Sequence, residues 1–145
     1  MTAMHRPGGA RDSIDAHSHA MEIPIRQVVE ELVGYLGATT VAAIAGVKET
    51  RAVQQWMADR EPQQPHLLRF ALQLVSMVAR RDQPDIARAW FHGSNPGLMD
   101  ETPIVLFRSR PLAEIQGQLL AAARTFAARD EIRSTTADTT ALNPI

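Results

Sequence analysis

Apolar residues recur at helical spacing in three stretches of this chain, each bounded by proline or glycine. The first such stripe, spaced i, i+3, i+4 along one side of a helix, contains Ile25, Val28, Val29, Leu32, Val33 and Leu36. Pro24 suits the first turn of this helix, and Gly37 suits the position just after its end. Similar stripes occupy residues 65–81 and 111–132. The spacing predicts an all-α fold.

Composition limits what such a fold can be. The 145 residues suffice for one ordinary domain, and aromatic residues make up only 5%, so aliphatic side chains must build the core. Cysteine is absent, which excludes disulfides and thiolate metal sites and fits a cytoplasmic protein. No apolar run approaches the roughly 18 residues of a membrane span, and the first residues lack the apolar core of a signal peptide. We expect a cytoplasmic chain with no membrane partner.

The two ends lack apolar periodicity. Residues 1–21 and 133–145 are small and polar, which predicts a flexible N-terminal arm and a flexible tail. His17 and His19 form an H-x-H pair, but no strand pattern or further fixed ligand accompanies them, so no metal site is predicted. Leu142 and Ile145 are the sizeable apolar groups of the tail, and they are either incidental or a short docking anchor.

The segment 39–57 (TTVAAIAGVKETRAVQQWM) has a pattern typical of a helix-turn-helix within a region of residues 22–61. Thr39 or Thr40 can cap a first short helix, and Gly46 stands where the chain must turn, because glycine adopts positive φ without a Cβ penalty. A second helix is expected from Lys48 to about residue 58.

In this motif the second helix enters the major groove of DNA. Arginine and lysine recognise guanine, glutamine recognises adenine, and threonine hydrogen-bonds or contacts a thymine methyl. The predicted DNA-binding residues are Thr39, Thr40, Lys48, Thr50, Arg51, Gln54 and Gln55. Glu49, Asp59 and a net charge of -1 oppose DNA contact, and the alternative is an ordinary αα-hairpin with a solvated polar face.

Residues 62–132 form a second helical region. Two prolines in the segment EPQQP break any helix, and Pro65 then opens a long one. Arg80 and Arg81 near its end either contact phosphate or balance the helix dipole. A short helix ends at Gly93, the composition of residues 94–97 (SNPG) predicts a tight turn, and the Thr-Pro pair at 102–103 predicts a new helix start.

Catalytic patterns are missing from these segments. Ser94 lacks the G-x-S-x-G elbow, and the glycines around it lack the strand and the Gly-Lys-Ser/Thr ending of a phosphate loop. No paired carboxylates, metal cluster or nucleophile–base spacing emerges. We therefore predict a protein that is not an enzyme and has no cofactor.

The order of Trp90, Asn95, Pro96, Leu98 and Pro103, after a helix-turn-helix and before a long C-terminal helix, resembles the Xre/MbcA/ParS antitoxins. The resemblance implies fold-defining roles: Asn95 and Pro96 set a turn, Trp90 packs it, and Pro103 restarts the helix. Where the family often has a small or glycine-rich step, this chain has the residues 99–101 (MDE).

The resemblance covers roughly residues 25–126 and implies an antitoxin that blocks a RES-domain toxin, an enzyme that degrades NAD, and represses its own operon. It implies that the helix-turn-helix half binds operator DNA and that the C-terminal half, with the signature residues, binds the toxin. The expected assembly is a homodimer or a larger toxin–antitoxin complex. The alternative is a stand-alone helix-turn-helix repressor that dimerises through its C-terminal helix.

Overall fold

The computed structural model describes the backbone of residues 11–142 and the side chains through residue 130, and this part of the chain is helical without strands. The helices, of which η1 is a 3-10 helix, are α1 (Ser13–Glu22), α2 (Ile25–Leu36), α3 (Ala38–Ala45), α4 (Thr50–Ala58), α5 (Pro65–Val78), α6 (Pro84–His92), η1 (Pro96–Leu98), α7 (Pro103–Ser109) and α8 (Leu112–Leu142). The all-α prediction is confirmed.

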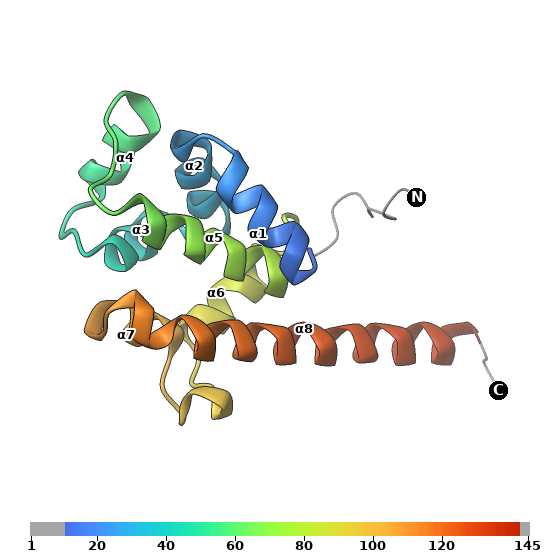
Figure 1. The fold of residues 1–145 in the computed structure, drawn as a ribbon. Coiled ribbons are helices and arrows are strands. Elements are labelled where there is room, and N and C mark those ends of the chain that lie inside the picture. The colour runs from blue at the N-terminus through green and yellow to red at the C-terminus, as the bar shows by residue number, and fades with distance from the viewer. Residues whose placement is uncertain (1–10, 143–145) are drawn as a thin grey trace.

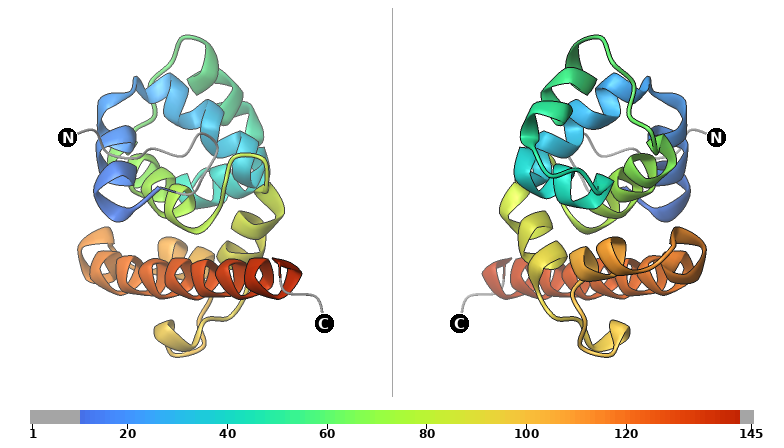
Figure 2. Two further views of the ribbon diagram at one scale, coloured as in Figure 1. Left: turned by 90° about the vertical axis from the view of Figure 1, so that its right-hand side faces the viewer. Right: turned by 90° about the vertical axis from the view of Figure 1, so that its left-hand side faces the viewer.

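The helices form two unequal layers (Figures 1 and 2). Helices α1 to α5 make the larger layer, while α7 and α8 lie along one side of it and α6 connects the two. The loop between α6 and α7 emerges on the side of α8 that faces away from α1–α5 (Figures 1 and 2). In the part of the chain that the structure describes, none of the helices combines the length and apolar character that crossing a bilayer requires.

Helix α5 is the centre of the core. It contacts α1, α2, α3, α6 and α8, and every residue from Phe70 to Ala79 is buried. A helix that is buried on all sides must be apolar on all sides, and the sequence FALQLVSMVA meets this with two polar exceptions, Gln73 and Ser76. The core therefore surrounds α5 rather than lying on one face of it.

An aromatic cluster joins the two layers. The Phe91 ring of α6 stacks on Phe107 of α7 at 5.8 Å between centroids, and Phe107 also lies 6.1 Å from Phe70 of α5. Trp90 meets Phe91 edge-on at 5.3 Å. Such pairs contribute roughly 0.5–1.5 kcal/mol each beyond their buried area. This cluster fixes the position of the α6–α7 loop relative to α5.

Helix α1 corrects the prediction of an N-terminal arm, which does not hold for residues 13–21. The Asp12 side chain caps the helix by accepting from the Asp15 N–H at 2.8 Å, and Ala16 and Ala20 are buried. At the other end, Arg69 of α5 donates to the carbonyl oxygen of Ala20 at 2.8 Å. These anchors come from a cap and a distant arginine, which apolar periodicity does not reveal.

The C-terminal boundary also differs from the prediction. Helix α8 continues to Leu142, whereas a helix end near residue 132 and an irregular tail from 133 were expected. Residues 1–10 and 143–145 of the two predicted termini, and the side chains of Leu142 and Ile145, lie outside the part that the structure describes.

Candidate functional site

Helices α3 and α4 are the pair expected to form the helix-turn-helix. Four residues, 46–49, connect them, and Gly46 has the left-handed conformation predicted for the turn, with φ of 77°. Its N–H closes the end of α3 on the carbonyl of Ala43 at 3.2 Å, and the Val47 N–H donates to Ala42 at 3.0 Å. A side chain at position 46 would be strained in this backbone, whatever space surrounds it.

The start of α3 differs from the prediction. The helix begins at Ala38 directly after Gly37, so neither Thr39 nor Thr40 caps it. Thr40 is only 8% exposed, and its hydroxyl is hydrogen-bonded to Nε2 of His92 on α6 at 3.1 Å. Thr40 therefore links α3 and α6, and its burial disfavours the predicted contact with DNA.

Except for Thr39 on α3, the other predicted DNA-binding residues lie on or beside α4, which begins at Thr50 rather than at Lys48. Arg51 and Gln54 are exposed and stand one helical turn apart, at i and i+3. Exposed Thr39 and Lys48 and half-buried Thr50 and Gln55 complete the set. Across residues 39–61, three cations (Lys48, Arg51, Arg60) are matched by three carboxylates (Glu49, Asp59, Glu61).

The segment from Trp90 to Pro103 forms a closed loop. Helix α6 ends at Gly93, as predicted, and a Cβ at this position would lie only 2.8 Å from the carbonyl oxygen of Ala89. The Asn95 side chain accepts from the Gly97 N–H at 2.9 Å. The Asn95 main chain closes the loop, because its N–H donates to Glu101 at 3.1 Å and its carbonyl accepts from Asp100 at 2.9 Å.

The restart of the chain as α7 follows the prediction closely. The Thr102 hydroxyl oxygen accepts from the Val105 N–H at 3.3 Å, and Pro103 takes the first helical position. Leu98 and Pro103 are buried, and Gly97 faces α8, since a Cβ on it would lie 3.7 Å from that of Ala122. The roles expected for the signature residues as turn-forming and packing groups match this geometry.

Two residues of this loop adopt a conformation that the sequence did not indicate. Met99 and Asp100 have φ angles of 56° and 65°, in the left-handed region that favours glycine. Met99 is also 90% exposed, the most exposed large apolar side chain in the described part of the chain. The chain therefore adopts a backbone that favours glycine with larger side chains at these two positions.

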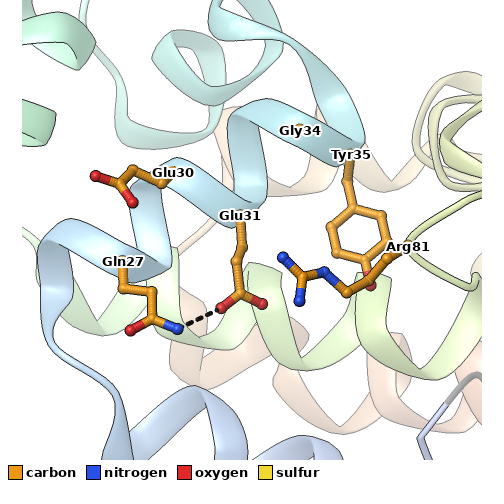
Figure 3. Close-up of a pocket in the computed structure, with 6 residues that line it drawn as sticks. All are labelled: Gln27, Glu30, Glu31, Gly34, Tyr35 and Arg81. Atoms are coloured by element: carbon orange, nitrogen blue, oxygen red, sulfur yellow. Dashed lines mark hydrogen bonds between the residues drawn. The ribbon is translucent and has the colours of Figure 1, made fainter. Parts of the chain in front are cut away.

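A polar cavity of about 320 Å³ lies beside α2 and the end of α5 (Figure 3). Buried Glu31 accepts from Gln27 Nε2 at 3.1 Å and pairs with His19 Nε2 at 2.7 Å, which ties α1 to α2. In Figure 3, the Arg81 side chain lies beside the Tyr35 ring and extends toward Glu31. Burial raises the pKa of the Tyr35 hydroxyl, with charged neighbours and a Ser76 hydrogen bond as smaller effects. The paired polar groups around Glu31 thus support α1 from α2.

The two histidines of the H-x-H pair have separate partners. Because residues two apart do not face each other on a helix, His17 lies 3.3 Å from Gln73 Oε1 while His19 meets Glu31. Among the described residues, no group of three His, Cys, Asp or Glu side chains could hold a metal ion.

The two arginines near the end of α5 also lie in different surroundings. Arg80 forms an ion pair with Asp82 at 3.0 Å, and Arg81 lines the polar cavity.

Comparisons with protein-family models, curated proteins and solved structures find no match to this chain.

Proposed function

We propose that this chain is an antitoxin that binds a RES-domain toxin through its C-terminal half and represses its own operon through α3 and α4. The observation that carries the proposal is the closed loop between α6 and α7. The residues that resemble the Xre/MbcA/ParS antitoxins lie in this loop or on the helices that flank it: Asn95 closes the loop through its main-chain hydrogen bonds, Leu98 is buried, Trp90 lies on α6 and Pro103 begins α7. That loop packs on α8, the long helix expected after it.

The toxin-binding half of the proposal has a direct test. The chain is co-expressed with the product of its adjacent gene, and the mixture is analysed by affinity capture and size-exclusion chromatography. We expect a stable complex, and we expect co-expression to restore growth and NAD levels in cells that produce the neighbour alone. A neighbour that neither binds nor harms cells would contradict the proposal.

The DNA-binding half rests on the exposed pair Arg51 and Gln54, whose spacing suits base contacts from the N-terminal part of a recognition helix. Because the charges around α4 balance, phosphate contacts should be few. Binding to the chain's own promoter should therefore show a shallow salt dependence compared with a strongly basic repressor.

Fluorescence anisotropy with promoter DNA over a range of salt concentrations tests this half. Arg51→Ala and Gln54→Ala should each weaken specific binding, whereas Arg26→Ala, an exposed arginine on α2, serves as a matched control for lost charge. Equal behaviour of all three variants would show that α4 is not the recognition helix.

A stand-alone repressor is the second candidate, and the length of α8 favours it. This helix has 31 residues, and its C-terminal part extends beyond the other helices (Figure 1). A second copy could pack against that extension. Light scattering and the promoter titration, both on the chain alone, test the second candidate: it requires a dimer that binds DNA fully without any partner and is lost when α8 is truncated after residue 130. It also requires that no complex forms with the adjacent gene product.

A further inference from the structure

A second cavity, of about 350 Å³, lies where the closed loop meets α6 and α8. Its walls come from three elements: Trp90 from α6, Asn95 and Pro96 from the loop, and Phe126 and Arg129 from α8. The cavity is partly open to solvent, and its exposed lining is mainly apolar. Three of the five signature residues, Trp90, Asn95 and Pro96, belong to its lining, yet the turn-forming roles of those residues do not require a hollow beside them.

Trp90, one of the residues that line this cavity, carries an unpaired donor that solvent does not reach. Trp90 is 5% exposed, and its indole Nε1–H is the single buried side-chain polar atom, within the described part of the chain, that lacks a hydrogen-bond partner. Buried polar groups are nearly always paired, and the cost of leaving one unpaired is large enough that each exception calls for a reason. An acceptor that arrives with a binding partner would supply the missing bond.

The charge of the cavity restricts what that partner can present. Arg129 is exposed at the rim, and no carboxylate belongs to the lining. An incoming group must therefore be apolar for the Trp90 and Phe126 walls and must carry an oxygen acceptor for the two donors. A cationic side chain would be repelled by Arg129, because no carboxylate of the lining offsets the two positive charges.

We infer that this cavity is an anchor site for the partner protein, which inserts one apolar side chain together with an adjacent carboxylate. The apolar side chain fills the space between Trp90 and Phe126, as central anchor residues do in protein interfaces. The carboxylate pairs with Arg129 and accepts from Trp90 Nε1. Because Nε1 is covered in the free chain, its wall must open slightly as the partner enters. The inference rests on the proposed function and names the part of the loop that binds.

The first arm of the test fills the cavity without touching its buried walls. Thr125 is an exposed lining residue on α8, so Thr125→Phe should occupy the space, whereas Gln116→Phe adds the same ring at an exposed position of α8 outside the lining. Titration calorimetry with the adjacent gene product should give at least about a tenfold weaker affinity for Thr125→Phe and at most a twofold change for the control. Unchanged thermal melting of both variants verifies folding.

Charge reversal at the rim forms the second arm. Arg129→Glu should weaken binding by a similar factor because it repels a carboxylate, while Arg129→Lys should retain most of the affinity. Equal affinities for the two variants would overturn the assignment of a carboxylate.

The third arm observes the donor itself. The chain has two tryptophans, Trp56 on α4 and Trp90, so a ¹⁵N-labelled sample gives two indole N–H resonances. On addition of the partner, the Trp90 resonance should move downfield as its N–H gains an acceptor, and Trp56 should not move. The inference requires both this shift and the affinity loss of Thr125→Phe, so the absence of either one overturns it.

The outcomes separate this inference from the proposed function. If the adjacent gene product binds, but Thr125→Phe binds equally well, the anchor site is wrong and the antitoxin proposal stands. If no complex forms with the unaltered chain, both are wrong.

Discussion

The α3–α4 region and the α6–α7 loop use their motif residues in opposite ways. On α4, none of the residues expected to read DNA is buried: Arg51 and Gln54 are exposed and Thr50 and Gln55 are half-buried, whereas Val53 and Trp56 are buried. Around the loop, the signature residues Trp90, Leu98 and Pro103 are buried, Asn95 is half-buried, and Pro96 is exposed together with residues 99–101. The motif residues of α4 thus lie at the surface, whereas the buried motif residues of the loop support its shape.

This difference separates two kinds of substitution. Changes on the outside of α4 should alter binding with little effect on folding. Changes to the signature residues of the loop should alter folding first, and binding through the shape of the loop. Under the proposed function, we expect the specificity of the loop for its partner to depend on the exposed residues Met99 to Glu101 and on the cavity behind the loop.

The largest expected contrast is in stability. Phe91 is fully buried between Trp90 and Phe107, so Phe91→Ala should lower the free energy of unfolding by about 3–5 kcal/mol. Gln54→Ala on α4 should stay within about 0.5 kcal/mol. Urea denaturation followed by circular dichroism measures both, and similar losses for the two variants would break the comparison.

A second contrast concerns binding. Arg51→Ala should weaken promoter binding by roughly 1–3 kcal/mol and leave partner affinity unchanged, because a bidentate base contact is lost on a helix that the partner does not touch. Thr125→Phe should do the reverse. Parallel titrations with DNA and with the partner test this, and a variant that weakens both equally would indicate one shared surface.

The link between the two regions can be tested at Thr40. Thr40→Val keeps the volume of the side chain and removes the hydrogen bond to His92, which should cost about 0.5–1.5 kcal/mol of stability. Thr39→Val is the matched control for stability alone, since Thr39 is exposed and adjacent but stays in the predicted DNA-binding set. Loss of DNA binding with unchanged stability in Thr40→Val would return Thr40 to the DNA-binding set.

The smallest expected effect is a gain. Met99→Gly relieves a left-handed conformation that costs an ordinary residue about 1–2 kcal/mol, offset by the roughly 0.5–1 kcal/mol entropic cost of glycine. We expect a net stabilisation of about 0.5–1 kcal/mol, measured as a rise in the denaturation midpoint. Met99→Ala keeps the strained backbone and should give no gain. If Met99 contacts the partner, Met99→Gly should weaken the complex while stabilising the free chain.

Local features of the fold were the predictable ones. The left-handed turn at Gly46 and the Thr102 cap follow from residue types at neighbouring positions, so the sequence indicates them. Helix α1 could not be anticipated by the same means, because its buried residues are only alanines and its anchors, such as Arg69, come from a distant helix. Thr40 was misassigned for a similar reason: its partner, His92, lies 52 positions away.

The cavity beside Trp90 was equally hidden from the sequence. Its walls combine α6 and α8, and nothing in the spacing of Trp90, Phe126 and Arg129 indicates that they meet. The left-handed Met99 and Asp100 are non-glycine residues, so their conformation follows from the closure of the loop rather than from their own preference.

Hydrogen–deuterium exchange of the chain with and without the adjacent gene product tests the central claim most directly. The account predicts slowed exchange in residues 93–101 and 122–130, which surround the closed loop and its cavity, and unchanged exchange in residues 48–58 of the α4 region. Protection confined to residues 48–58, or no protection anywhere, would contradict it.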